Sequence, residues 1–200
     1  MRNLAISGKP KFRYNRNMAT AREPHKSGDS VETIRELQEI TKAYLLGVLH
    51  DATERKHTYR VSQKSKAFVE QIARGIKELG GNSWTYKEGQ NRSVYIVEFS
   101  KFFLKDTRIT TKKDRIDYIR GYFDTDGGIA KSGKVRFYIY FAQKDLQDLK
   151  QVKTFLQELG VICGRIHNPS HKVDPNYWRF YISAKSYQDF ANKIGSLSFG

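Results

Sequence analysis

Apolar residues between positions 31 and 45 follow the spacing of an amphipathic helix. They are Val31, Ile34, Leu37, Ile40, Tyr44 and Leu45. Asp29 and Ser30 lie directly before this run, and either side chain can accept a hydrogen bond from the free N–H groups at a helix start. We therefore expect a helix that begins at Val31 and leads into the segment YLLGVLHDAT at residues 44–53.

The second half of the chain repeats the pattern of the first. The segments YRVSQK (59–64) and IYFAQK (139–144) both end in Gln-Lys, and both precede a helical run that ends in Glu-Leu-Gly. Gln63 and Gln143 are 80 residues apart. The order of elements predicts two αββαββα repeats, which is an α+β fold with two antiparallel sheets. The expected turns within the repeats are Lys87–Asn91 and Asn168–Asn176.

Polar and apolar residues alternate in residues 134–143, which predicts a strand with one buried and one exposed side. The residues expected on the buried side are Val135, Phe137, Ile139 and Phe141, and those expected on the exposed side are Lys134, Arg136, Tyr138 and Tyr140. In the first repeat, the equivalent exposed residues are Lys56, Thr58 and Arg60, with Tyr59 and Val61 on the buried side. Both sheets thus expose basic and aromatic side chains, and a two-stranded ribbon fits the major groove of DNA.

Charge narrows the choice of partner. The 200 residues include 36 Lys and Arg against 21 Asp and Glu, a formal net charge of +15, so the chain attracts polyanions. The single cysteine, Cys163, excludes an intrachain disulfide and a multi-cysteine zinc site. No run approaches the ~18 apolar residues of a membrane span, and we expect no signal peptide, because Met1, Arg2 and Asn3 do not lead into the apolar segment of one. We expect a protein that is not secreted and lies in the cytoplasm or nucleoid, or in an organelle matrix if organelle-encoded.

The pattern divides the chain into three parts. Residues 1–30 hold seven basic and two acidic residues without hydrophobic periodicity, so they form either a solvated tail or a basic arm that contacts phosphates. Residues 31–110 form the first repeat and residues 111–200 the second. Each repeat opens on a helix that contains a central glycine, Gly47 or Gly121, which costs about 1 kcal/mol relative to alanine. Close packing of the two helices would explain both glycines.

The nonamers LLGVLHDAT (45–53) and IRGYFDTDG (119–127), each followed by the same order of strands and helices, resemble the paired motifs of the LAGLIDADG homing endonucleases. The resemblance covers residues 31 to 199. It implies a monomer in which the two motif helices pack side by side and two sheets form a saddle over double-stranded DNA. It also implies that the last acidic residue of each motif binds Mg²⁺ between the scissile phosphates, with Ca²⁺ as a substitute that supports binding without cleavage.

The two motifs differ at the carboxylate that this resemblance identifies. Asp126 lies five residues after Gly121, as in the family, and we predict that it is a metal ligand. Five residues after Gly47 is Ala52, and the nearest carboxylate, Asp51, lies one residue earlier, a rotation of about 100° on a regular helix. We therefore assign the metal site to Asp126, Asp51 and the Ala52 position. Either a differently wound helix end brings Asp51 to the metal, or the first half-site is degenerate.

Other site residues follow from the same repeat. Gln63 and Gln143 end equivalent strands, where the family places polar groups near the active site. Lys113 is the candidate basic residue, with Lys112 as its neighbour. Asp124 suits a structural hydrogen bond better than metal ligation. The predicted DNA-binding residues are Lys56, Thr58, Arg60, Lys134, Arg136, Tyr138, Tyr140, Arg165 and Arg179.

The resemblance implies a site-specific endonuclease that makes a double-strand break at a long asymmetric DNA target. Two other functions remain open from the residues. One is an RNA maturase that assists splicing of its own intron, and the other is a DNA-binding protein or nickase with degenerate chemistry. Basic sheets suit all of these functions, so the two carboxylates distinguish them.

Overall fold

The computed structural model describes residues 39–130 and 136–197. The predicted basic arm at residues 1–30, the start of the predicted helix at Val31, and the strand residues Lys134 and Val135 lie outside the described residues. No helix in the described ranges is long and apolar enough to cross a membrane.

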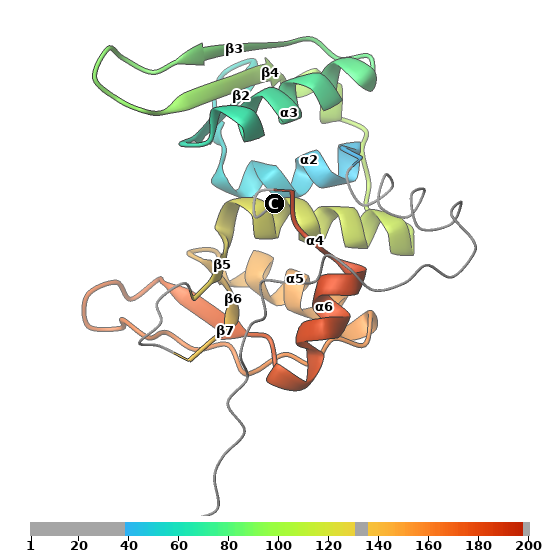
Figure 1. Ribbon diagram of the computed structural model, residues 1–200, viewed down its shortest axis with the longest axis vertical. Coiled ribbons are helices and arrows are strands. Elements are labelled where there is room, and N and C mark those ends of the chain that lie inside the picture. The colour runs from blue at the N-terminus through green and yellow to red at the C-terminus, as the bar shows by residue number, and fades with distance from the viewer. Residues whose placement is uncertain (1–38, 131–135, 198–200) are drawn as a thin grey trace, which may run out of the picture.

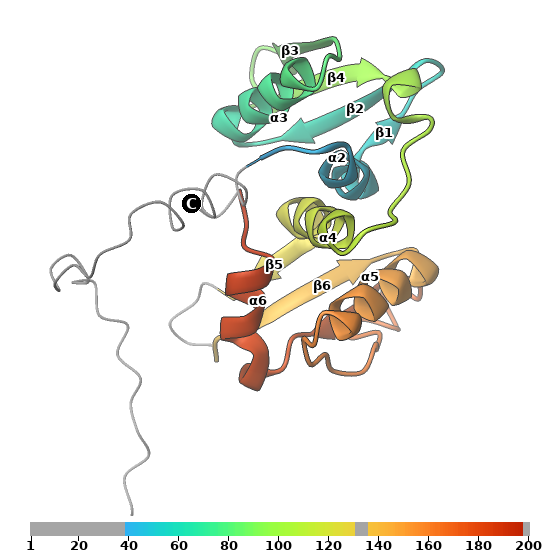
Figure 2. The same cartoon turned by 90° about the vertical axis from the view of Figure 1, so that its right-hand side faces the viewer.

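Two helices lie side by side at the centre of the molecule, with one sheet on each side of the pair (Figures 1 and 2). They are α2 (Lys42–Val48), continued by the 3₁₀ turn η1 (Leu49–Asp51), and α4 (Lys112–Asp126). Thr41 caps α2 by accepting a hydrogen bond from the Tyr44 N–H. The predicted continuous helix from Val31 through Leu45 is therefore wrong in its described part, because the backbone at Thr41 is extended and a new helix begins at Lys42.

The two motif glycines allow the helix pair to pack backbone against backbone. A Cβ atom at Gly47 would lie 2.1 Å from the Tyr118 carbonyl oxygen, and one at Gly121 would lie 2.1 Å from the Tyr44 carbonyl oxygen. These distances are far below a van der Waals contact. The reciprocal contacts confirm the expected reason for both glycines and define a pseudo-twofold axis between the helices.

The first repeat forms a four-stranded antiparallel sheet in the order β1-β2-β4-β3. Its strands are β1 (Thr53–Glu54), β2 (Thr58–Gln63), β3 (Ser83–Lys87) and β4 (Tyr95–Ser100). Helix α3 (Lys66–Glu78) covers the face that also packs on α2, and this face carries the buried Val61, Val97 and Phe99. The repeat closes with the 3₁₀ helix η2 (Lys101–Leu104) in place of the expected third helix.

The second repeat forms a three-stranded antiparallel sheet in the order β5-β6-β7. Its elements are β5 (Gly127–Ile129), β6 (Ile139–Gln143), α5 (Leu146–Glu158), β7 (Trp178–Tyr181), η3 (Ala184–Ser186) and α6 (Tyr187–Lys193). The expected fourth strand is reduced to two isolated bridges, Cys163 to Ile182 and His167 to Arg179. Each repeat has its own hydrophobic core, and Leu46 of α2 packs against both cores.

The predicted strand at residues 134–143 is longer than the observed one. Strand β6 begins at Ile139, so Arg136 precedes it, and Phe137 is 49% exposed instead of buried. Phe137 packs edge-on against Tyr187 of α6 instead of entering the core. The alternation does hold inside β6, where Ile139 and Phe141 are buried.

Candidate active site

Asp126 is the last residue of α4 and accepts a hydrogen bond from the amide of a strand end in its own repeat. The Gln143 Nε2 atom, at the end of β6, donates to Asp126 Oδ2 at 3.0 Å. Burial and the nearby charge of Asp51 together raise the pKa of Asp126 to about 7, while the Gln143 hydrogen bond opposes the shift. Asp126 at the end of α4 is therefore close to Gln143 of β6 and to Asp51 of the first repeat.

Asp51 has the same arrangement in the first repeat. The Gln63 Nε2 atom, at the end of β2, donates to Asp51 Oδ2 at 2.7 Å. The Asp51 side chain reaches solvent, yet the surrounding protein atoms desolvate its carboxylate and raise its pKa, with the Gln63 bond opposing them. The structure therefore brings together Asp51, Gln63, Asp126 and Gln143 as two equivalent pairs.

The 3₁₀ turn η1 explains how Asp51 reaches this position one residue early. A 3₁₀ helix turns by about 120° per residue, whereas an α-helix turns by about 100°. Over Leu49–Asp51 the tighter winding adds about 60° of rotation. The added rotation offsets more than half of the roughly 100° that Asp51 lacks because it lies one residue earlier in its motif than Asp126 does. The Ala52 backbone that follows is extended and its side chain carries no ligand atom, so Ala52 has no carboxylate to offer.

The chemistry of this pair of carboxylates fits a divalent cation. Two desolvated like charges act on each other, and within residues 39–130 and 136–197 neither Asp51 nor Asp126 forms an ion pair with a basic side chain. A hard cation with oxygen ligands would relieve this repulsion. No group of three or more His, Cys, Asp or Glu side chains gathers in the described part of the chain, so the remaining ligands would have to be phosphate or water oxygens.

A second pair of equivalent contacts fixes the motif helices to each other. The Tyr44 hydroxyl of α2 donates to Asp124 Oδ2 at 2.7 Å, and the Tyr118 hydroxyl of α4 lies 2.6 Å from His50 Nε2. Asp124 also accepts the Leu197 N–H at 3.1 Å. His50 and Asp124 hold equivalent places in the two motifs, so the contacts agree with the predicted structural role of Asp124.

The face of the second sheet that points away from the helices carries an arginine surrounded by tyrosines. The Arg179 guanidinium lies over the Tyr140 ring at 4.6 Å and donates to the Tyr177 hydroxyl at 2.8 Å. Tyr138 packs edge-on against Tyr181 next to them. Burial lowers the pKa of Arg179, but its hydrogen bonds to the tyrosines outweigh burial and raise it overall. This face, which we call the outer face, is basic and aromatic as predicted.

The outer face of the first sheet holds Arg60 in contacts within the protein. Arg60 donates to Ser62 Oγ at 2.9 Å and to the Tyr86 hydroxyl at 3.3 Å. It also forms an ion pair with Glu88, and its side chain is 13% exposed. Tyr86 in turn donates to the buried Glu98 at 3.1 Å. Arg60 lies on the predicted face, but it would have to leave Glu88 to contact another molecule.

The remaining predicted binding residues lie in different settings. Thr58 is on the outer face and donates to Glu98, while Arg136 and Arg165 are exposed outside regular strands. Lys56 was predicted on a strand, but it lies in the turn between β1 and β2 and lines a cavity with Tyr59 of the opposite face. Its assignment to the outer face is therefore wrong. Lys134 lies outside the described residues.

Lys113 does not lie near the carboxylates. It is in the first turn of α4, whereas Asp126 is the last residue, a separation of about 20 Å along the helix. Its ammonium pairs with Asp117 at 3.6 Å and with Glu39 at 3.8 Å. The prediction that Lys113 is the basic catalytic residue is wrong, because the first turn of α4 lies at the end of the helix opposite to Asp126.

A different pair of basic residues follows the two glutamines in the sequence. Lys64 directly follows Gln63, and Lys144 directly follows Gln143, so the two lysines take equivalent places next to the two glutamines that contact the carboxylates. Lys64 is exposed, and Lys144 is 73% exposed with Asp174 at 3.6 Å. The repeated Gln-Lys pair was the signal in the sequence that could have identified them.

Known proteins resemble this chain in sequence and in fold. Residues 113–195 match the family model of the LAGLIDADG-like domain. A comparison with curated protein sequences found no match. Among solved structures, the homing endonuclease I-DmoI in complex with DNA and Mn is similar over 80% of this chain and 97% of its own, with 23% identity and a TM-score of 0.58.

A second protein shares the fold. The N-terminal LAGLIDADG domain of DUF199/WhiA matches 86% of this chain and 94% of its own, with 18% identity and a TM-score of 0.61. Full-length DUF199/WhiA from Thermatoga maritima matches 82% of this chain and 60% of its own, with 18% identity and a TM-score of 0.62. These similarities cover both repeats, and they show that the two-repeat α+β architecture is shared.

Proposed function

We propose that this chain, which matches the LAGLIDADG-like domain over residues 113–195, is a site-specific DNA endonuclease that makes a metal-dependent double-strand break at a long, asymmetric target. The observation that carries this proposal is the pair of carboxylates, Asp51 and Asp126, at the adjoining ends of the two motif helices. A glutamine of the same repeat holds each of them. A carboxylate at a helix C-terminus is opposed by the helix dipole, so a purely structural role gives no reason for either residue.

Asp51 and Asp126 would hold divalent metal, and Mg²⁺ suits their oxygen ligands. Metal bound there would activate water and neutralise charge that develops at a phosphodiester. Gln63 and Gln143 keep the carboxylates oriented. We assign Lys64 and Lys144 as the basic residues that contact the phosphates at the two cleavage positions. The solved I-DmoI complexes contain DNA with Mn or Ca, and a variant was crystallised with its target DNA in the presence of Mg, which supports divalent metal here.

The two outer faces would form the DNA-binding saddle. They carry Arg179 with its tyrosines on one sheet, and Arg60 with Trp84 and Tyr86 on the other. Both carboxylates are on one chain, so the protein would act as a monomer on double-stranded DNA. The two sheets differ in side chains, and an asymmetric pair of surfaces requires an asymmetric target.

Cleavage of a supercoiled plasmid that carries a target selected from a randomised library tests the proposal. We expect Mg²⁺ to give linear product. Asp51→Asn and Asp126→Asn should each abolish cleavage while binding measured in Ca²⁺ survives, because both outer faces stay intact. Linear product from Asp51→Asn at the wild-type rate would contradict the assignment of the first carboxylate.

The difference between the motifs favours one second candidate, a nickase or DNA-binding protein. Ala52 stands where Asp126 stands in the second repeat, so the first half-site depends on Asp51 alone. If this candidate is right, the wild-type protein gives nicked or uncut plasmid, and Asp51→Asn changes nothing. Ala52→Asp would then add cleavage of the second strand.

A further inference from the structure

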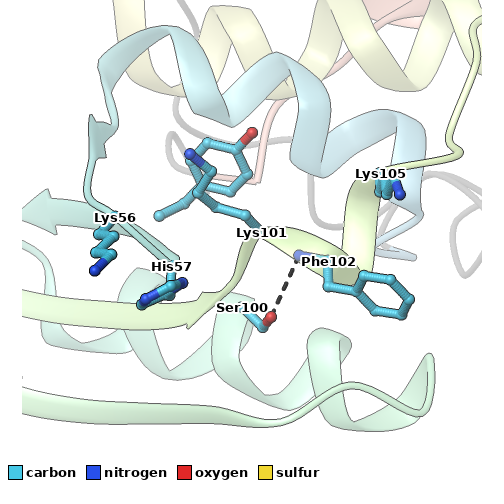
Figure 3. Close-up of a pocket in the computed structure, with 7 residues that line it drawn as sticks. Lys56, His57, Ser100, Lys101, Phe102 and Lys105 are labelled. Atoms are coloured by element: carbon cyan, nitrogen blue, oxygen red, sulfur yellow. Dashed lines mark hydrogen bonds between the residues drawn. The ribbon is translucent and has the colours of Figure 1, made fainter.

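An exposed phenylalanine lies between two cavities on the helix side of the first sheet. Phe102, in η2, is 77% exposed. One cavity, of about 380 Å³, is lined by Lys56, His57, Lys101 and Lys105 beside the Phe102 ring. Figure 3 shows these side chains, which come from the β1–β2 turn and from the end of β4 and η2, with the Phe102 ring projecting outward.

The second cavity adjoins the other side of the same ring. Its volume is about 450 Å³, and its lining includes Lys42, Phe103 and Asp106. Together the two cavities present four lysines and one histidine against a single acidic residue. Of these lysines, Lys101 pairs with Glu54, while the other three form no ion pair with an acidic residue in the described ranges.

This surface, which we call the Phe102 site, is separate from the carboxylates and the outer faces. Lys42 is the first residue of α2, whereas Asp51 ends its 3₁₀ extension, so the site and the carboxylates lie toward opposite ends of one helix. Tyr59 lines the cavity from the core side of β2, opposite to Arg60. Duplex bound to the outer faces would leave the Phe102 site accessible.

An accessible aromatic ring with lysines on both sides matches the chemistry of an unpaired nucleotide. A base can stack on the ring, and adjacent phosphates can meet the ammonium groups. The Lys105 ammonium lies over the Phe102 ring at 5.9 Å from its centroid, so a base would stack on the other face of the ring or displace this ammonium. Paired bases are unavailable for stacking, so duplex DNA cannot use the ring in this way.

We propose that the Phe102 site binds single-stranded nucleic acid, with a base stacked on Phe102 and phosphates on Lys42, Lys56 and Lys105. The residues that form it make contacts to base planes and phosphates, which RNA and DNA share. The site is independent of nuclease activity, and a protein without cleavage activity would keep it.

Fluorescence anisotropy of the full chain with labelled oligouridylate and oligothymidylate tests the proposal. Loss of one stacked base predicts that Phe102→Ala weakens binding by about fivefold to 100-fold, and that Phe102→Trp retains it. Phe137→Ala serves as the matched control, because Phe137 is an exposed phenylalanine of the second repeat that packs on Tyr187 and lies outside both outer faces. It should leave binding of both oligonucleotides unchanged. Tighter binding of oligouridylate would identify RNA as the ligand, and tighter binding of oligothymidylate would identify DNA.

Photocross-linking locates the bound strand. Oligonucleotides that contain 4-thiouridine or 5-bromodeoxyuridine should attach to the peptide that contains residues 101–105, and Phe102→Ala should remove that attachment. Unchanged affinity of Phe102→Ala, or cross-links confined to the outer faces, would overturn the proposal. A loss of affinity only in lysine variants would also overturn it, because that result indicates phosphate binding without stacking.

Discussion

At the scale of single residues, the raised pKa of Asp126 makes the metal-free protein sensitive to pH. An unfolded aspartate titrates near pH 4, whereas burial and Asp51 raise the pKa of folded Asp126 to about 7. Between these values the folded state binds more protons than the unfolded state. Stability therefore falls as pH rises through this window, and the penalty is complete above pH 7.

Asp126→Asn should remove this penalty. In chelator at pH 8 we expect the variant to be more stable than wild type by about 1–3 kcal/mol, less than the full shift implies because the carboxylate still reaches solvent. At pH 4.5 most of the difference should vanish. Urea unfolding at the two pH values measures it, with the exposed Glu78→Gln as a control. A variant that loses stability at pH 8 would contradict the prediction.

Site residues that occur at equivalent positions of the two repeats could be predicted from the sequence. A site residue suggested only by its closeness in sequence to a motif could not. The 80-residue offset between Gln63 and Gln143 identified two residues that the structure places on the two carboxylates. Lys113 was chosen by closeness in sequence to the second motif. Helix α4 has 15 residues and places Lys113 about 20 Å from Asp126. Closeness in sequence to the motif therefore did not mean closeness to the carboxylates.

At the scale of elements, the helix pair depends on its two glycines. Gly47→Ala and Gly121→Ala should each lower the free energy of unfolding by about 3 kcal/mol or more, because the added methyl group would overlap a backbone carbonyl that cannot move alone. Chemical denaturation measures this loss. Gly164→Ala is the matched control, since its nearest contact would be 3.4 Å, and we expect less than about 1 kcal/mol. If Gly47→Ala and Gly121→Ala lowered the free energy of unfolding as little as Gly164→Ala does, the helices could separate freely and the prediction would be wrong.

The ends of elements were the least predictable part of the fold. The alternation at residues 134–143 gave the correct faces for Ile139 and Phe141 but extended the strand too far. The alternation assigns Phe137 to the same side as the buried Ile139 and Phe141. In the structure, however, Phe137 packs against Tyr187 of α6 before the strand begins. Contacts between segments that are distant in sequence can override the local alternation of polar and apolar residues, and this alternation cannot predict them.

At the scale of the whole molecule, duplication is what the sequence predicted best. A repeated order of motif, strand pair and helix requires two similar cores, and the structure has one core on each side of the helix pair. The asymmetries were not predictable in the same way. The lost fourth strand of the second sheet and the 3₁₀ helix that closes the first repeat depend on tertiary contacts that differ between the halves.

The net charge of +15 leads to a prediction for the binding of this chain to DNA. If lysines and arginines neutralise phosphates, the logarithm of the binding constant should fall linearly with the logarithm of salt concentration, by about 0.9 for each phosphate contact. Lys64→Ala and Lys144→Ala should each reduce the slope by about 1. Lys113→Ala should not change it, because its ammonium is held by Asp117 at the far end of α4. Fluorescence anisotropy in Ca²⁺ across a salt series measures these slopes, and a flat response would rule out binding through the phosphates.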